Sequence, residues 1–375
     1  MSGLKLTSFR NYASLSLSLD ERSVVLTGPN GAGKTNLLEA LSFLSPGRGL
    51  RRAALEDAAR RPGDGSWAVA ASLVNRIGDV DIGTGIALDA DGPQNRRTVR
   101  VNRAAARSSE ALLEHVRIVW LTPAMDGLFT GPAADRRRFL DRAVLAIDRQ
   151  HGSRVSAFER TMRGRNRLLS EANPDRTWLS AIETEMAELA VAIAAARREW
   201  VTLAIGLIAE SGTGGVFPNS AIALDGLLEG ELSDRSASVV EDRYREALGA
   251  NWRRDAAAGR TLAGPHRSDL RVRHEAKDAA AETCSTGEQK ALLIGLVLAQ
   301  ARLAARMSGE TPIILLDEIA AHLDEMRRDA LFAILNELGC QTFMTGTDAQ
   351  AFASFGPTAV TLAVDSGHIR PVEAG

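Results

Sequence analysis

The feature that most constrains the fold of this chain is a glycine-rich turn between a short apolar segment and an apolar helix. Residues 23–27 predict a buried strand, and residues 34–44 predict the helix. The turn has the full P-loop spacing Gly-x-x-x-x-Gly-Lys-Thr and consists of Gly28, Pro29, Asn30, Gly31, Ala32, Gly33, Lys34 and Thr35. A strand, a glycine-rich turn and a helix in this order predict an α/β fold with a loop that can hold phosphate groups.

The chemistry of this turn favours ATP and Mg²⁺ as bound cofactors. Glycines let backbone N–H groups surround the β- and γ-phosphates without interference from Cβ atoms, and the following helix points its positive end at them. Lys34 is expected to neutralise phosphate charge during catalysis, and the Thr35 hydroxyl is expected to bind Mg²⁺. Asn36, the next residue, belongs to the expected nucleotide contacts.

A second predicted strand, residues 313–316, contains only apolar side chains and ends in Asp317 and Glu318. A strand of this kind is typical of a parallel sheet that is buried on both faces. We expect Asp317 to bind Mg²⁺ and Glu318 to be catalytic by polarising the attacking water. Many core strands end in an acidic residue, so this pattern is informative only because a P-loop is present in the same chain.

A third motif, residues 285–290 (Ser-Thr-Gly-Glu-Gln-Lys), precedes a long apolar helix predicted at residues 291–305. It resembles the signature motif of ABC-type ATPases, although Thr286 stands where the family most often has glycine. The resemblance implies that Ser285 and Gly287 bind the γ-phosphate of a nucleotide held by a second subunit, and therefore an ATP-dependent homodimer. The local alternative is a capping box, in which Ser285 and Glu288 satisfy the first N–H groups of the helix.

Two further positions are defined by comparison with ABC-type ATPases. Residues 342–348 predict a strand that ends where many of these proteins have a histidine that senses the γ-phosphate, and this chain has Thr345 or Thr347 there. A hydroxyl can reach a phosphate, but a strand that ends in an ordinary polar turn explains the threonines equally well. Residues 320–324 lie where the family has a loop that contacts the partner subunit.

The composition favours a cytoplasmic protein without membrane contact. The net charge is −2, so a nucleic-acid surface has to be a local patch of the protein. The two cysteines, Cys284 and Cys340, suggest no disulfide framework and fit a reducing compartment. The first ten residues lack the apolar segment of a signal peptide, and no apolar run is expected to be long enough to span a bilayer.

The middle of the chain, residues 136–210, is predicted to be mostly helical, with apolar side chains at heptad spacing. Asn173-Pro174-Asp175 interrupts the pattern, which predicts two helices joined by a turn. These helices form either a short antiparallel arm at residues 150–210 or an ordinary pair of core helices. We therefore predict an ATPase lobe I from residues 1–115 and 260–375, and a helical lobe II from residues 116–259.

Further motifs resemble the RecF family of bacterial recombination mediators, which are SMC-like ABC ATPases. They are Phe9-Arg10-Asn11-Tyr12, the P-loop, Arg136-Arg137-Arg138-Phe139-Leu140-Asp141, Arg165-Asn166-Arg167-Leu168-Leu169, Gly264-Pro265-His266-Arg267-Ser268-Asp269-Leu270 and Ser285 to Lys290. The resemblance implies an α/β ABC-type ATPase head with a mixed sheet, and an inserted helical lobe with a short antiparallel arm. It also implies that Arg10 contacts the nucleotide.

The function implied by this resemblance does not follow from spacing or composition. It is ATP-driven dimerisation, slow DNA-stimulated ATP hydrolysis, and binding of single- and double-stranded DNA at gaps. The implied partners in DNA repair and at the replication fork are RecO and RecR, with which the family promotes RecA loading. The alternative is a soluble ABC ATPase that acts on another macromolecule, such as a translation or defence factor. The translation factors usually have two ATPase halves in tandem, whereas this chain has one P-loop.

Three groups of arginines are compatible with DNA binding through phosphates. They are Arg48, Arg51 and Arg52; Arg96, Arg97, Arg100 and Arg103; and Arg160, Arg163, Arg165 and Arg167. The alternative for each group is a solvated face balanced by nearby acidic residues. Arg136 to Arg138 have a separate structural alternative, which is to hold the start of the helical lobe in place.

Overall fold

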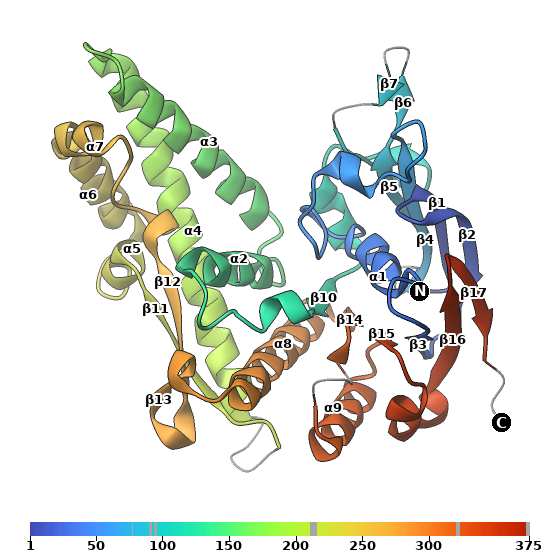
Figure 1. Cartoon of the computed structure of the whole chain (residues 1–375). Coiled ribbons are helices and arrows are strands. Elements are labelled where there is room, and N and C mark those ends of the chain that lie inside the picture. The colour runs from blue at the N-terminus through green and yellow to red at the C-terminus, as the bar shows by residue number, and fades with distance from the viewer. Residues whose placement is uncertain (77, 90–91, 94–95, 211–215, 320–322, 373–375) are drawn as a thin grey trace. The chain divides into compact units, whose positions relative to one another are not determined.

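The computed structural model describes residues 1–76, 78–89, 92–93, 96–210, 216–319 and 323–372. The chain forms two compact units. In Figure 1 the colour follows the residue number from blue at the N-terminus to red at the C-terminus. Unit 1 consists of Met1–Asp126 and Gln300–Gly375, and unit 2 consists of Gly127–Ala299. Each unit is described below by itself.

Unit 1 contains an antiparallel sheet in the order β2-β1-β4-β5-β8-β9. Its strands are β1 (Gly3–Phe9), β2 (Tyr12–Ser18), β4 (Trp67–Asn75), β5 (Gly78–Ile86), β8 (Thr98–Val101) and β9 (Ala104–Ala105). Strand β4 alternates strictly between buried and exposed side chains, as expected for a sheet with one solvated face. Short apolar runs at residues 67–74 and 80–88, which glycine and aspartate interrupt, correspond to β4 and β5. A short ladder, β6 (Leu88–Asp89) with β7 (Gly92–Pro93), follows β5.

The second sheet of unit 1 is largely parallel and has the order β10-β14-β15-β3-β16-β17. Its strands are β3 (Ser23–Thr27), β10 (Ile118–Leu121), β14 (Ile313–Leu316), β15 (Thr342–Gly346), β16 (Ala359–Asp365) and β17 (His368–Pro371). Strands β3, β14 and β15 are buried at every position, and only the β16–β17 pair is antiparallel. The mixed sheet that the resemblance implied is therefore accompanied by the separate antiparallel sheet.

Helix α1 (Lys34–Ser42) belongs to the same hydrophobic core as strands of both sheets. Leu37, Leu38 and Leu41 are fully buried, which explains why a helix of only nine residues is stable here. Helix α9 (Glu325–Leu338) begins after Asp324, whose carboxylate accepts a hydrogen bond from the N–H of Arg327, and the 3₁₀ segment Gln350–Thr358 packs beside it. Shorter 3₁₀ turns lie at Leu55–Ala58, Ser109–Glu114 and Pro123–Met125.

Unit 2 is built around a long helical hairpin. Helices α3 (His151–Leu169) and α4 (Arg176–Glu210) flank the predicted Asn-Pro-Asp turn. Unit 2 also contains α2 (Ala133–Val144), α5 (Leu227–Glu231), α6 (Ala237–Ala250) and α7 (Trp252–Ala258). Buried side chains of α3, α4 and α6, including Phe158, Met186 and Tyr244, form one core. The hairpin is thus both an antiparallel pair and a core element along much of its length.

A small sheet places residues 260–299 in unit 2. Strand β12 (Asp269–His274) pairs over its whole length with β11 (Ser220–Asp225), and β13 (Ala279–Ala280) pairs with its end. The boundaries therefore lie at residues 126–127 and 299–300, whereas we expected lobe II to cover residues 116–259. The difference arises because strand pairing across a long sequence separation leaves no local pattern in the chain.

Three buried arginines hold unit 2 together. Arg165 is fully buried and binds Glu183, Asp255, the Thr261 hydroxyl and the Leu248 carbonyl, so that one side chain joins α3, α4, α6 and α7. Arg197 of α4 pairs with Asp141 of α2 at 2.8 Å and donates to the carbonyl of Pro265 at 2.7 Å. Arg136 pairs with Asp269 at 2.7 Å and 2.9 Å, which confirms that it is structural. The motifs most specific to the RecF resemblance thus meet in the interior of unit 2.

Helix α8 (Thr286–Ser308) begins in unit 2 and ends in unit 1. By length and composition alone it is apolar enough to cross a membrane, so the expectation that no apolar segment reaches this length is wrong for α8. Of its most apolar window, however, 67% is buried inside the protein, as in a core helix.

Candidate functional site

The P-loop follows β3 and leads into α1 with the backbone conformation that its glycines permit. Gly28, Gly31 and Gly33 have φ values of 144°, 82° and 115°, in the region that other residues rarely adopt. A Cβ on Gly28 would lie 2.2 Å from the carbonyl oxygen of Val364, and one on Gly33 would lie 2.4 Å from the Asn11 side chain. Glycine is therefore required at these two positions for backbone geometry and for space.

The turn between β1 and β2 supports the P-loop from one side. The Asn11 amide donates to the carbonyl of Ala32 at 3.1 Å and accepts from the Asn36 amide at 2.7 Å. The Tyr12 hydroxyl donates to the carbonyl of Gly33 at 2.9 Å. Asn36, predicted as a nucleotide contact, therefore lies beside the loop and helps to hold its shape.

Lys34 is buried and has no carboxylate partner among the residues that the structure describes. Its ammonium group donates to the carbonyl oxygens of Gly28 at 2.6 Å and Pro29 at 2.9 Å. Burial lowers the pKa of Lys34, and the nearby charges of Glu318 and Asp317 partly oppose this shift. An ammonium group held only by neutral carbonyls retains its capacity to bind an anion.

Asp317 lies at the carboxyl end of β14 and contacts the P-loop helix. Its Oδ1 accepts hydrogen bonds from the hydroxyls of Thr35 at 2.9 Å and Thr345 at 2.8 Å. Strand β15 lies between β14 and β3 in the parallel sheet, so the carboxyl ends of all three strands meet at one edge. The predicted site residues Lys34, Thr35 and Asp317, separated widely in sequence, are brought together there.

Thr345 organises this edge. The sequence left open whether Thr345 or Thr347 stands in place of the γ-phosphate-sensing histidine, and that role stays a prediction. The Thr345 side chain is fully buried, whereas Thr347 is exposed. Besides donating to Asp317, its hydroxyl accepts a hydrogen bond from the N–H of Glu318 at 2.8 Å. Glu318 has a φ of 53°, a left-handed conformation that costs a non-glycine residue roughly 1–2 kcal/mol. The hydroxyl of Thr345 therefore helps to hold Glu318 in a strained backbone position.

Arg10 lies against a buried carboxylate in this structure. Its guanidinium binds both oxygens of Glu39, at 2.8 Å and 2.6 Å, and donates to the carbonyl of Asp57 at 2.6 Å. Arg51 also binds Glu39 at 2.9 Å. Glu39 is fully buried and was missed by the sequence argument, although a carboxylate on the apolar side of the predicted helix could have revealed it. The predicted contact of Arg10 with a nucleotide remains a prediction.

The predicted signature residues form the start of α8 in unit 2. Ser285, Thr286 and Gly287 are exposed. The Glu288 carboxylate accepts from the Ser285 N–H at 3.0 Å and from the Ser285 hydroxyl at 2.9 Å, so the return half of the capping box is formed. A hydrogen bond from Lys277 is the largest cause that lowers the pKa of Glu288 to about 2, and the bonds from Ser285 contribute further. A capped and exposed helix start is compatible with either interpretation of the motif.

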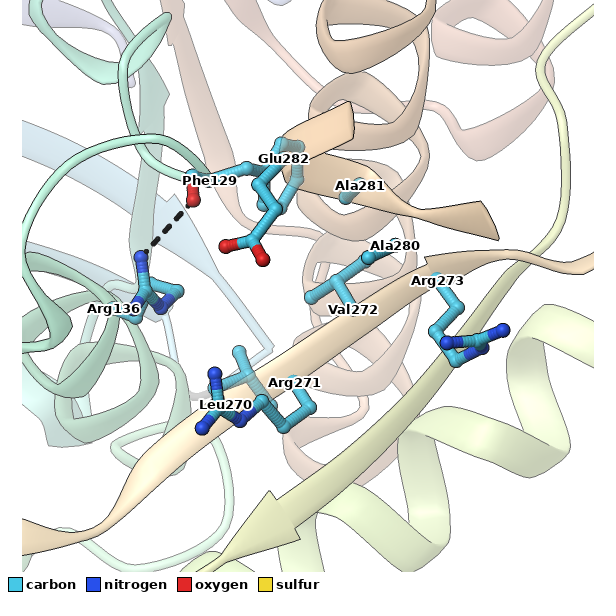
Figure 2. Close-up of a pocket in the computed structure, with 9 residues that line it drawn as sticks. All are labelled: Phe129, Arg136, Leu270, Arg271, Val272, Arg273, Ala280, Ala281 and Glu282. Atoms are coloured by element: carbon cyan, nitrogen blue, oxygen red, sulfur yellow. Dashed lines mark hydrogen bonds between the residues drawn. The ribbon is translucent and has the colours of Figure 1, made fainter. Parts of the chain in front are cut away.

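Figure 2 shows a pocket of unit 2 that lies close in sequence to the signature residues. Its lining residues are Phe129, Arg136, Leu270, Arg271, Val272, Arg273, Ala280, Ala281 and Glu282. The arginines are already engaged: Arg136 with Asp269, Arg271 with Asp225 and Asp269, and Arg273 with Asp278. The dashed line in Figure 2 marks the 3.2 Å bond from Arg136 to the carbonyl of Phe129. The pocket is therefore lined by structural ion pairs.

Two of the arginines in the groups that are compatible with DNA binding, Arg165 and Arg97, are structural. Arg165 is fully buried in its network, as described above. Arg97 donates to the carbonyls of Phe43, Ser45 and Gly47, and burial lowers its pKa to about 10. For these two residues the structural alternative holds, because each side chain binds carbonyls or carboxylates of the protein itself. The expected partner-contact loop, residues 320–324, lies partly outside the described residues, since 320–322 are not among them.

Solved structures with the same fold include two described as the recombination mediator protein RecF in the RecFOR pathway. The one described as RecF-ATPrS has a TM-score of 0.83 at 20% identity, and the one described as RecF-ATP has 0.81 at 21%. Each match covers 99% of this chain and 98% of the other. An Smc head domain from Pyrococcus furiosus matches with a TM-score of 0.53 at 15% identity, covering 99% and 95% of the two chains. This likeness establishes the α/β ATPase-head fold.

Sequence comparison identifies the family. Residues 1–368 match the RecF/RecN/SMC N terminal domain. The DNA replication and repair protein RecF of Mesorhizobium japonicum is 60% identical over 373 residues, with 100% of this chain and 98% of the relative covered. That of Rhizobium meliloti is 57% identical over 366 residues, with 98% and 97% covered. The chain therefore belongs to the RecF family of DNA replication and repair proteins.

Proposed function

We propose that this protein is an ATP-hydrolysing DNA-binding dimer of recombinational repair, with its nucleotide site at the carboxyl edge of the parallel sheet. The observation that supports this most directly is the cluster formed by the P-loop, Lys34, Asp317 and Glu318. The Lys34 ammonium is held by neutral carbonyls and the Asp317 carboxylate by hydroxyls, an arrangement that suits a charged ligand. Membership of the RecF family removes the need for a translation or defence role.

Lys34 and the P-loop N–H groups bind the β- and γ-phosphates in this proposal. The Thr35 hydroxyl and the Asp317 carboxylate lie 2.9 Å apart, and hard oxygen ligands of this kind fit Mg²⁺. When bound, the ion would neutralise charge on the phosphates. Because Asp317 also accepts from Thr345, its carboxylate is oriented before any ligand arrives.

Glu318 is the proposed catalytic base or water-orienting group. Its carboxylate follows the strand end directly, and its backbone is held by the Thr345 hydroxyl at 2.8 Å. A carboxylate that polarises water supplies the charge needed for attack on the γ-phosphate without becoming a nucleophile itself. Thr345 acts through Asp317 and Glu318, so its proposed role is to position them.

A second subunit completes the site in this proposal. Ser285 and Gly287 are exposed at the start of α8, where the helix dipole favours an anion. If they bind the γ-phosphate held by another copy, ATP joins two subunits and hydrolysis releases them. Unit 1 then serves as the ATPase lobe and unit 2 as the helical lobe.

DNA, RecO and RecR are the proposed partners, and the cytoplasm is the proposed compartment. The family functions in DNA replication and repair, and solved structural neighbours are described within the RecFOR pathway. We infer that DNA at single-strand gaps promotes the ATP-bound dimer and stimulates slow hydrolysis. Binding through phosphates would make the affinity fall with salt, with a log–log slope of about −0.9 for each duplex phosphate neutralised.

A mixing experiment tests the two-subunit site. Ser285→Arg places bulk and charge at the proposed contact while leaving the P-loop of its own subunit intact. Lys34→Ala removes the P-loop lysine while leaving Ser285 intact. Each variant alone is expected to lack ATPase activity, and the mixture is expected to regain part of it, because a mixed dimer has one site with an intact P-loop facing an intact Ser285.

Light scattering with and without ATP provides the second measurement. Ser285→Arg is expected to bind ATP and remain monomeric. Ser285→Ala, which removes only the hydroxyl, is the milder companion variant. If Ser285→Arg dimerises with ATP and hydrolyses it, residues 285–290 are a helix cap and not a signature motif.

A further inference from the structure

The turn end of the α3–α4 hairpin has a concentration of arginines that the buried networks of unit 2 do not use. We call this region the tip surface, and it consists of Arg167, Arg176, Trp252, Arg253, Arg254 and Arg260. All five arginines are exposed. None of them forms an ion pair with a carboxylate in the described part of the chain. By contrast, exposed Arg243 and Arg245 on nearby α6 are paired with Glu231 and Asp242.

Contacts within unit 2 show that these residues, although distant in sequence, form one surface. The N–H of Thr261 donates to the Asn166 side chain at 2.8 Å, which places the loop containing Arg260 against the end of α3 that leads into the turn. The Arg176 guanidinium lies 4.4 Å from the centre of the Trp252 ring, and that of Arg253 lies 5.3 Å from it. Figure 1 shows α7 beside the hairpin, in agreement with these contacts.

The tip surface has an excess of positive charge. Within residues 165–178 and 251–260, the acidic residues are Glu171, Asp175 and Asp255. Asp255 is buried and paired with Arg165. Asp175 accepts hydrogen bonds from the N–H groups of Thr177 at 2.8 Å and Trp178 at 3.1 Å, where it caps α4. A cluster of unpaired guanidinium groups on a protein with a net charge of −2 favours a polyanionic ligand.

The first turn of α4 also contains an exposed indole, which can distinguish between kinds of polyanion. Trp178 lies two residues after Arg176 in the first turn of α4, and 59% of its surface is exposed. Single-stranded nucleic acids present base faces that stack on aromatic rings, whereas a duplex hides them within its stack.

We propose that the tip surface, together with Trp178, binds single-stranded DNA. The arginines contact phosphates, and the Trp178 indole stacks on a base. This inference rests on the proposed DNA-binding function and assigns the single-stranded part of the ligand to the end of the hairpin in unit 2. The proposed single-strand site does not include the arginine groups at residues 48–52 and 96–103.

Charge-matched variants test the phosphate contacts. The triple variant Arg176→Gln, Arg253→Gln and Arg254→Gln removes three unpaired charges from the tip surface. The control Arg235→Gln, Arg243→Gln and Arg245→Gln removes three charges of unit 2 that are ion-paired. Affinity for an oligothymidylate is measured by fluorescence anisotropy at several salt concentrations. The tip variant is expected to lose affinity and to have a log–log salt slope shallower by about 2, at roughly 0.7 for each single-strand phosphate contact. The control is expected to retain the wild-type slope.

The stacking contact has its own measurement. Trp178→Ala is expected to weaken oligothymidylate binding by about 5- to 150-fold, the range for one lost base–aromatic stack, and to leave binding of a blunt duplex unchanged. Trp178→Phe is expected to restore most of the affinity. Intrinsic tryptophan fluorescence should be quenched by the oligonucleotide in the wild type and clearly less in Trp178→Phe.

Three outcomes would decide against the assignment or its premise. If the tip variant binds like the charge-matched control, the tip surface is not a DNA site. If it loses duplex and single-strand affinity equally and Trp178→Ala has no effect, the surface is a general polyanion site and the single-strand assignment is overturned. If the wild-type protein binds neither DNA, the failure belongs to the proposed DNA-binding function itself. Circular dichroism of each variant confirms that the exposed substitutions leave the fold intact.

Discussion

The interior of unit 2 and the proposed nucleotide site of unit 1 hold their buried charges in opposite ways. In unit 2, Arg165 and Arg197 meet carboxylates on neighbouring helices, and their remaining donors bind carbonyls or hydroxyls. In the proposed nucleotide site of unit 1, the Lys34 ammonium donates to the carbonyl oxygens of Gly28 and Pro29, and the Asp317 carboxylate accepts from the hydroxyls of Thr35 and Thr345. The ion pairs of unit 2 neutralise charge within the fold. Lys34 and Asp317 keep charges that a ligand can neutralise.

This difference shows why a charged residue in a family motif is not by itself a site residue. A buried ion pair whose donors are all satisfied is costly to break, because removal of one side chain leaves the charge of the other buried without a partner. A buried charge without an opposite partner destabilises the empty protein instead, which is consistent with the lowered pKa of Lys34. Substitutions should therefore affect stability in unit 2 and ligand chemistry in unit 1.

The largest effect is expected from Glu318→Gln. The amide keeps the shape of the side chain but lacks the negative charge that polarises water, so the hydrolysis rate should fall by about 10²- to 10⁴-fold. ATP binding should persist, and the ATP-bound dimer should accumulate in light scattering. The control is Glu325→Gln, an exposed acid in the first turn of α9. Near-normal steady-state hydrolysis by Glu318→Gln would remove Glu318 from the catalytic role.

Arg165→Met should produce the largest loss of stability. It leaves Glu183 and Asp255 without their buried partner, so the free energy of unfolding measured in urea should fall by about 3–5 kcal/mol. The matched control is Arg163→Met on the same helix, whose 3.9 Å pair with Glu159 is exposed, and for which about 0–1 kcal/mol is expected. Equal losses for the two variants would contradict the structural role of Arg165.

Lys34→Ala should weaken ATP binding and leave the stability of the protein nearly unchanged, the opposite of what is expected for Arg165→Met. Charge-assisted contacts with phosphate contribute roughly 1.5–3 kcal/mol each, so ATP affinity in calorimetry should fall at least about tenfold. The urea midpoint of the ligand-free protein should not fall comparably, since only two neutral carbonyl contacts are lost. Lys5→Ala, on an exposed position of β1, is the control for the charge. An unchanged dissociation constant for ATP would reject the P-loop assignment.

Thr345→Val should have the smallest of these effects. The substitution keeps the volume but removes the hydroxyl that joins Asp317 to the Glu318 N–H, and one such loss costs about 1–3 kcal/mol. Hydrolysis should slow by about tenfold or more while ATP affinity changes less. Thr345→Ser should recover most of the rate, and Thr347→Val should leave it unaltered because that residue is exposed. A large effect of Thr347→Val alone would transfer the role to Thr347.

Local patterns were sufficient for the elements around the P-loop. The strand at 23–27, the turn and the helix that follows are specified by neighbouring residues, because glycine geometry and apolar runs act over short distances. The strand before Asp317 was equally clear, since it is buried at every position. The hairpin was predicted from its heptad spacing and from the Asn-Pro-Asp turn.

Other features depend on partners that are far away in sequence. Glu39 becomes a member of the site only through Arg10 and Arg51, and Arg97 is structural only because the carbonyls of Phe43, Ser45 and Gly47 converge on it. The place of residues 260–299 in unit 2 follows from the pairing of β12 with β11. A side chain does not reveal its distant partner in its own sequence neighbourhood.

The sequence by itself thus determined the glycine-rich P-loop turn, the acidic strand end and the family to which the chain belongs, because contiguous residues specify each of them. Tertiary structure alone decided which charged side chains are available to a ligand. Arg165 and Arg167 lie two positions apart on one helix, yet the first is fully buried in an ion-pair network and the second is exposed. The physical reason is that the cost of burying a charge depends on the carboxylates and carbonyls that folding brings to it.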